Sequence, residues 1–156
     1  LDSHGGSGNL NKMINLQKLH ESDFNLWVEE IKTKIQRRDL EDMDWDNLLD
    51  EIDDMGASQK RALDSYLQRL IEHVLKLQYW EGERDRCRNG WMAEIANFRG
   101  RIKRILKKNP SLKNYMVNEY DEIYQDAMTT MKFQFHLPDD CFISLQEIMR
   151  EDLFNN

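Results

Sequence analysis

The feature that most constrains the fold of this chain is a run of apolar residues at helical spacing in its middle. The residues lie three or four positions apart, which places them on one face of an α-helix. They are Leu63, Tyr66, Leu67, Leu70, Val74 and Leu77. Ile71, Leu75 and Tyr79 add apolar positions beside that face. A helix that is apolar over so much of its circumference packs against several neighbours, so we expect residues 58–80 to form the central helix of a helical domain.

Further segments carry the same helical spacing on both sides of the central helix. We predict helices over residues 23–38, 44–56, 89–109 and 110–133, and a short last helix at 144–149. Gly56 is expected to end the second helix. The polar residues 81–89 are expected to connect the third helix to the fourth, which Asn89 caps. Pro110 follows Asn109 and is expected to begin the fifth helix.

The length and the short connections predict how these helices are arranged. A chain of 156 residues can form one domain with a buried core. Short connections favour antiparallel neighbours, so we predict an all-α fold, an up-and-down bundle of four to five helices with a short C-terminal helical appendage. The bundle is predicted over residues 13–133, with residues 134–156 as a loop and short helix packed on the same domain. Residues 1–12, which are rich in Gly and Ser, are interpreted as a linker or a remnant of an expression tag.

Two oppositely charged stretches flank the central helix. Residues 39–54 contain nine acidic residues and no basic one, whereas residues 84–113 contain ten basic residues against Asp85 and Glu94. Both stretches lie around ordinary apolar faces, so compensation between them within one bundle is the favoured interpretation. The basic surface that remains is the candidate partner-binding site, formed by Arg99, Arg101, Lys103, Arg104, Lys107 and Lys108.

The net charge and the positions of the aromatic residues indicate which kind of partner suits this basic surface. The net charge of −7 argues against coating of nucleic acid as the main role, because Lys and Arg dominate binding to phosphates. Trp91 and Phe98 fall on the apolar face of the predicted helix 89–109, so stacking on bases is not indicated. A protein partner or a second copy of the chain is therefore favoured over nucleic acid.

His73, Glu51 and Asp44 are weak candidates for catalytic residues. Asp44 and Glu51 are seven residues apart and share a helix face, and His73, read as the only histidine of the helical body, lies beside the central apolar face. A cluster of these groups would suit acid–base chemistry or a divalent metal. Metal sites in bundles use Glu-x-x-His pairs from several helices, whereas Glu72 directly precedes His73 here. We therefore favour structural roles, with no catalytic residue, metal or cofactor.

The two cysteines and the apolar runs bear on location. Cys87 and Cys141 do not make a disulfide framework, so a reducing cytoplasm is the expected location. Cys141 follows two aspartates, which disfavour its thiolate, and we expect it to be a packing residue. No apolar run approaches about 18 residues, so no membrane span is predicted.

Several segments in a fixed order resemble one protein family. They are LHESDFNLW (19–27), DWDNLLDEIDDMG (44–56), LDSYLQRLIEHVLKLQYW (63–80), the run from Trp91 to Lys113, YQDA (124–127) and FHLPDDCFISLQEI (135–148). Over residues 19–150 their order and spacing resemble the bacterial family named domain of unknown function 29. The family's tail commonly has proline directly after the Phe135 equivalent and after the Cys141 equivalent, and this chain has His136 and Phe142 there. The resemblance implies an all-helical fold and no established activity, so it assigns no catalytic residue.

These observations favour a non-enzymatic helical interaction protein that binds a macromolecular partner or itself. The alternative is a small nucleic-acid-binding or nucleic-acid-processing protein that uses the basic residues 99–108, with Glu51 and His73 as its chemical pair. Convergence of Glu51 and His73 in a cleft beside Arg99 or Arg101 would favour the alternative.

Overall fold

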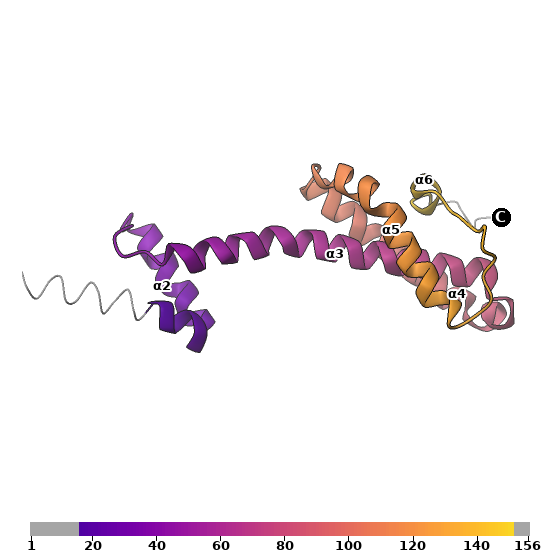
Figure 1. The fold of residues 1–156 in the computed structure, drawn as a ribbon, viewed down its shortest axis with the longest axis horizontal. Coiled ribbons are helices and arrows are strands. Elements are labelled where there is room, and N and C mark those ends of the chain that lie inside the picture. Colours follow the sequence, from indigo (N-terminus) through magenta and orange to yellow (C-terminus); the bar gives the residue numbers. More distant parts are fainter. Residues whose placement is uncertain (1–15, 152–156) are drawn as a thin grey trace, which may run out of the picture. The chain divides into compact units, whose positions relative to one another are not determined.

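The chain folds into helices, as the apolar periodicity predicts (Figure 1). The computed structural model describes residues 16–151, and within this range no strand is present. After a helical stretch at residues 16–22 come α2 (Phe24–Gln36), α3 (Trp45–Tyr79), α4 (Glu81–Lys108), α5 (Leu112–Lys132) and α6 (Leu145–Ile148). The predicted all-α class, with packed helices and a short C-terminal helix, is confirmed. The proposed linker at residues 1–12 lies outside the described residues.

The described part of the chain divides into two compact units, residues 16–56 and residues 57–151. Helix α3 belongs to both, because Trp45–Gly56 falls in the first unit and Ala57–Tyr79 in the second. The sequence-based domain boundaries at residues 13–133 and 134–156 stay a prediction.

The N-terminal unit has a small core. Asp23 caps α2, since its carboxylate accepts a hydrogen bond of 3.1 Å from the backbone N–H of Leu26. Arg38 and Asp42 adopt positive φ angles of 57° and 56° in the turn that follows α2. The buried apolar residues of this unit are Leu16, Trp27, Ile31 and Met43, with Leu19 and Leu48 packed against them.

The C-terminal unit has the larger core, which α3, α4 and α5 form together. From α3 it takes Leu63, Leu67, Leu70, Ile71, Val74, Leu75 and Leu77, each at most 2% exposed. Helix α4 adds Ile95, Phe98 and Ile102. Helix α5 adds Leu112, Met116, Tyr120, Ile123, Tyr124, Ala127, Met128 and Met131.

The tail after α5 is joined to this core by long-range hydrogen bonds. The Tyr124 hydroxyl donates to the carbonyl of Cys141 at 2.9 Å, and the Tyr120 hydroxyl donates to the carbonyl of Ile143. The Arg99 Nε donates to the carbonyl of Ile148 at 2.9 Å. Because these donors satisfy carbonyls of a tail with little secondary structure of its own, they hold it against α4 and α5.

Two predicted breaks in the helical pattern are wrong, and α5 begins at Leu112 instead of Pro110. Gly56 does not end a helix, because α3 continues through it to Tyr79 and Gly56 has no positive φ. Glycine inside a helix costs only about 1 kcal/mol relative to alanine, less than the loss of a turn of helix within a packed chain. Residues 81–89 are not a connection but the first turns of α4, where Glu81 and Glu83 favour the positive end of the helix dipole.

The position of Gly56 inside α3 predicts that Gly56→Ala stabilises the protein. A Cβ added there meets no atom within 4 Å, and alanine is the better helix former, so we expect a gain of about 0.5–1 kcal/mol in the free energy of unfolding. Urea unfolding followed by circular dichroism measures the change. A loss of stability would instead indicate a left-handed glycine that ends the helix.

Candidate partner-docking groove

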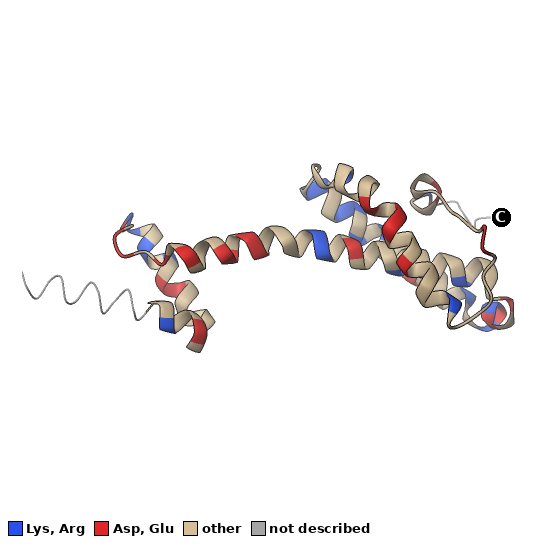
Figure 2. Cartoon of the chain, viewed as in Figure 1, with Lys and Arg blue, Asp and Glu red and all other residues tan. Residues whose placement is uncertain are grey.

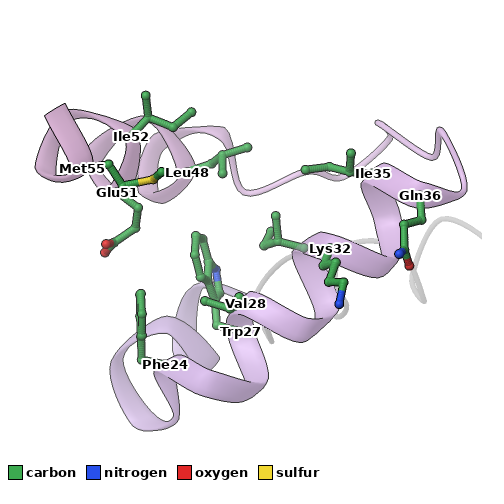
Figure 3. A pocket seen from close by; sticks show the side chains of 11 residues that line it. Phe24, Trp27, Val28, Lys32, Ile35, Gln36, Leu48, Glu51, Ile52 and Met55 are labelled. Carbon is green, nitrogen blue, oxygen red and sulfur yellow. The ribbon is translucent and has the colours of Figure 1, made fainter. Parts of the chain in front are cut away.

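An apolar groove runs between α2 and the first turns of α3, within the N-terminal unit (Figure 3). Its volume is about 560 Å³. Its lining residues are Phe24, Trp27, Val28, Ile31, Lys32, Ile35 and Gln36 of α2 with Leu48, Glu51, Ile52 and Met55 of α3. Figure 3 shows Glu51 near Phe24 and Met55 at one end, and Lys32 and Gln36 at the other. The middle of the groove is therefore formed by apolar side chains.

The groove exists because two helices in this unit carry more apolar side chains than they can cover. Trp27 and Ile31 are buried, but Phe24 is 49% exposed, Ile52 54% and Met55 70%. Among the described residues, nine of the twelve large apolar side chains that remain exposed lie in the N-terminal unit. Phe24, Val28, Ile35 and Ile52 lie at apolar helical spacing in the segments predicted as helices at residues 23–38 and 44–56, and the structure leaves these four side chains exposed.

Asp44 and Trp27 hold the floor of the groove together. The Trp27 Nε1–H donates to Asp44 Oδ2 at 3.0 Å, and the Asn47 amide donates to the same oxygen at 2.8 Å. Both Trp27 and Asp44 are 2% exposed. A buried carboxylate is retained where donors satisfy it, so Asp44 fixes α2 against the start of α3. Asp44 stays only a weak candidate for a catalytic residue, as in the sequence analysis.

His20 contacts three residues that line the groove: Glu51, Phe24 and Trp27. Its Nε2 lies 2.8 Å from Glu51 Oε1, and its ring contacts Trp27 edge-on at a centroid distance of 4.8 Å and Phe24 at 5.7 Å. The interpretation of His73 as the only histidine in the helical body is therefore wrong. The spacing of four residues from His20 to Phe24 and seven to Trp27 was a signal in the sequence, but the expected helix start at residue 23 concealed it.

His73 lies in the C-terminal unit with partners of its own. Its Nδ1 is 2.7 Å from the carbonyl oxygen of Arg69, and its ring packs on Phe98 at 5.3 Å. Burial lowers the pKa of His73, while the Arg69 carbonyl opposes that shift. Glu51 and His73 are carried by one helix, α3, and each is bonded to a different group. The contacts in the structure thus pair Glu51 with His20 and not with His73.

The six basic candidates of the fourth helix fall into two groups. Arg99 is 6% exposed and bonded to the tail, and Lys103 forms an ion pair with Glu151. The other four, Arg101, Arg104, Lys107 and Lys108, are exposed on α4. The sequence spacing placed Arg99 on the surface. Spacing alone cannot show that the tail, 49 residues further along the chain, packs on Arg99 and accepts its hydrogen bond.

Charge is unevenly distributed over the helices (Figure 2). Acidic residues follow one another along the first turns of α3, and basic residues gather on α4. The acidic stretch forms the pairs His20–Glu51 and Lys34–Asp39 inside the N-terminal unit. The basic stretch forms Arg86–Glu83 and Lys103–Glu151 inside the C-terminal unit. The pairs that the structure shows are thus internal to each unit and do not demonstrate the expected compensation between the two stretches.

Metal-ligating and nucleophilic side chains do not gather in the described part of the chain. Between residues 16 and 151 no group of three His, Cys, Asp or Glu side chains is positioned to hold a metal ion. Cys141 is buried with its sulfur 3.5 Å from that of Met128, and burial raises the pKa of its thiol. Cys87 is half-buried, and both cysteines are free thiols. Over the same residues, no helix combines the length and apolar character that crossing a membrane requires.

The fold and the groove define an all-helical protein in which a small N-terminal unit exposes an apolar groove between two helices. The chain belongs to the family described as domain of unknown function DUF29, whose model matches residues 19–154. This confirms the resemblance that the ordered segments indicated. No curated protein and no solved structure matches the chain.

The burial of Asp44 predicts that Asp44→Ala loosens α2. Removal of the carboxylate leaves the indole N–H of Trp27 without its acceptor, so we expect a loss of about 1–3 kcal/mol in the stability of the N-terminal unit. Asp44→Asn keeps one acceptor oxygen and should cost less. Hydrogen exchange of the α2 amides localises the effect, and unchanged protection in Asp44→Ala would show that the contact is dispensable.

The lowered pKa of His73 predicts a pH-dependent stability. The unfolded chain takes up a proton at this residue at higher pH than the folded chain, so stability falls as pH drops through the unfolded value of about 6.5. His73→Gln removes this contribution and should flatten the dependence between about pH 5 and 7. Urea midpoints measured across that range test it; wild-type and variant curves that run parallel would contradict the expectation.

Proposed function

We propose that this chain is a non-enzymatic helical interaction protein that docks a helix of a macromolecular partner in the groove between α2 and α3. The observation that carries the proposal is the groove itself, with Phe24, Val28, Ile52 and Met55 exposed along an almost wholly apolar surface. Large exposed apolar surfaces on soluble proteins mark interaction sites, because burying them returns roughly 25 cal/mol for each Å² removed from water.

The lining favours a helix as the occupant. A helix satisfies its own backbone groups and presents only side chains, which suits a groove without convergent polar groups. A strand would need an exposed sheet edge, and residues 16–151 contain no strand. The indole N–H of Trp27, the polar group of the groove's largest aromatic residue, is already donated to Asp44. Anchors at positions i, i+3, i+4 and i+7 of the partner helix would fill the space between Phe24 and Ile52.

Net charge favours a different protein over a second copy. Residues 16–56 contain thirteen acidic and five basic residues, a net charge of −8. Two such units brought together at their grooves repel each other, whereas a cationic partner is attracted. The second copy remains the competing occupant, and the oligomeric state distinguishes the two.

Two further features bear on the proposal: one supports a non-enzymatic role, and the other supports a reducing location. The polar groups that line the groove lie at its opposite ends and do not converge on one point. A reducing compartment such as the cytoplasm suits the free thiols of Cys87 and Cys141.

The second candidate function is binding of nucleic acid by the exposed part of α4. It is favoured by Arg101, Arg104, Lys107 and Lys108, none of which takes part in an ion pair within residues 16–151. It is disfavoured by the aromatic residues nearby, since Phe98 is buried and Trp91 is half-buried and stacked on Trp80.

Affinity capture from a native lysate, with and without nuclease, tests both functions at once. We expect captured proteins to persist after nuclease treatment, and to be lost with the double variant Val28→Asp, Ile52→Asp, because docking would remove the hydration of two carboxylates placed in an apolar groove. Val117→Asp is the matched control, since Val117 is an exposed valine of α5, 57% accessible, away from the groove lining.

The other outcomes separate the alternatives. Capture that nuclease abolishes and that Arg101→Gln, Arg104→Gln weakens would favour nucleic acid. Light scattering that shows a dimer dissociated by Val28→Asp, Ile52→Asp would identify a second copy as the occupant. Identical captured proteins and identical mass for wild type and groove variant would overturn the docking role.

A further inference from the structure

A second, smaller hollow lies in the C-terminal unit between α3 and α4. Gln59, Ala62 and Tyr66 of α3 line it on one side, and Arg101, Arg104 and Ile105 of α4 on the other. Its volume is about 260 Å³. The spacing explains the arrangement, because residues 59, 62 and 66 share one helix face, as do residues 101, 104 and 105. Two arginines, a tyrosine and a glutamine therefore line one hollow.

Arg101 is held in position by three contacts with neutral groups. Its Nη1 donates to the Tyr66 hydroxyl oxygen at 3.3 Å, its guanidinium carbon lies 5.4 Å from the centroid of the Tyr66 ring, and its Nε donates to Asn97 Oδ1 at 3.3 Å. None of these partners carries a negative charge. Within the described chain no carboxylate forms an ion pair with Arg101 or Arg104.

The charge of the hollow is therefore uncompensated. Arg101 and Arg104 are three residues apart on one helix, a spacing at which like charges destabilise the helix. Lys108 extends the same face, four residues after Arg104. An anion seated between the guanidinium groups relieves this repulsion and makes charge-assisted hydrogen bonds to both.

We propose that this hollow binds a phosphomonoester dianion. The groups that line it offer donors: the guanidinium N–H groups of Arg101 and Arg104, and the Gln59 amide. The Tyr66 oxygen accepts from Arg101, so its own O–H is directed away from Arg101 and is available to an anion. A phosphomonoester presents three terminal oxygens and nearly two charges at pH 7, which matches two arginines; a carboxylate or a phosphodiester carries one charge.

This site is independent of the groove between α2 and α3. It lies wholly in residues 57–156, shares no residue with the groove, and binds by charge instead of apolar burial. The chemistry identifies a terminal phosphate group, which a small phosphorylated molecule or the phosphorylated end of a nucleic-acid strand can supply.

Titration of the full-length protein with inorganic phosphate tests the assignment, with the side-chain Nε–H signals of the arginines as the readout. We expect saturable shifts at Arg101 and Arg104, with a Kd of about 1 mM or tighter. Arg101→Gln and Arg104→Gln should each weaken binding by about tenfold or more, since each removes a hydrogen bond to a charged group. Tyr66→Phe should weaken it a few-fold. Arg86→Gln is the matched control, because Arg86 is an exposed arginine of α4 that pairs with Glu83.

The pH dependence distinguishes a dianion from a general anion. Phosphate binding should weaken as pH falls below about 6, where the second proton returns, whereas sulfate, which stays dianionic, should show no such loss. Circular dichroism confirms that the variants are folded. Shifts of equal size at Arg86 and at Arg101, or phosphate affinity unchanged in both arginine variants, would overturn the site.

Two further ligands identify the source of the phosphate. Glycerol phosphate binding as tightly as inorganic phosphate supports a small phosphorylated molecule, and tighter binding of an oligonucleotide only when it carries a terminal phosphate supports a strand end. Equal affinity for oligonucleotides with and without that terminal phosphate would overturn the assignment to a monoester and support the backbone-binding candidate function.

Discussion

Burial of one face of α3 is the interaction on which the C-terminal unit depends. Leu63, Leu67, Leu70, Ile71, Val74 and Leu75 are completely buried there by α4, α5 and the tail. Side chains of this size contribute about 1.5–3 kcal/mol each when fully buried, so this face is a major source of the unit's apolar stabilisation. Because this core is covered within the unit, the polar face of α4 stays at the surface, and it includes the hollow beside Tyr66 and Arg101.

The N-terminal unit buries its apolar side chains less completely than the C-terminal unit does. Its core contains four buried apolar residues, fewer than its two helices expose, and a polar contact between Trp27 and Asp44 fixes the helices together. That contact sets a spacing at which α2 and the start of α3 leave a groove between them. An apolar surface of this kind is a thermodynamic cost to an isolated chain and a source of affinity once it is covered. The groove is therefore explained better by a partner than by the unit's own stability.

The sequence predicted most of what depends on local periodicity. Helical class, the buried face of α3 and the apolar faces of α2 and α4 all follow from side chains three and four residues apart. The errors in the predicted helix boundaries have a local cause. Gly56 and residues 81–89 read as breaks because single-residue signals were weighted above the continuing helical pattern around them, although glycine inside a helix costs only about 1 kcal/mol.

The candidate site was harder to predict because it depends on what covers each face. Periodicity placed Phe24 and Ile52 on apolar faces but gave no measure of whether another element packs on them. Arg99 carries the same charge as Arg101, yet a tail carbonyl takes Arg99 into the interior while Arg101 stays on Tyr66 at the surface. Only tertiary contacts distinguish the two, so a basic helix in a sequence overstates the basic surface of the folded protein.

The groove and the hollow would bind their ligands by different forces, and these forces respond differently to salt. Binding in the groove relies on apolar burial, which added salt does not screen. Binding in the hollow relies on Arg101 and Arg104, whose attraction to an anion is screened over about 10 Å at 0.1 M ionic strength. A rise in ionic strength should therefore release an anion, whereas a docked helix should lose only the charge-based part of its affinity. Helix α3 supplies Ile52 to the groove and Tyr66 to the hollow, so one continuous helix contributes to both of the surfaces for which we propose binding.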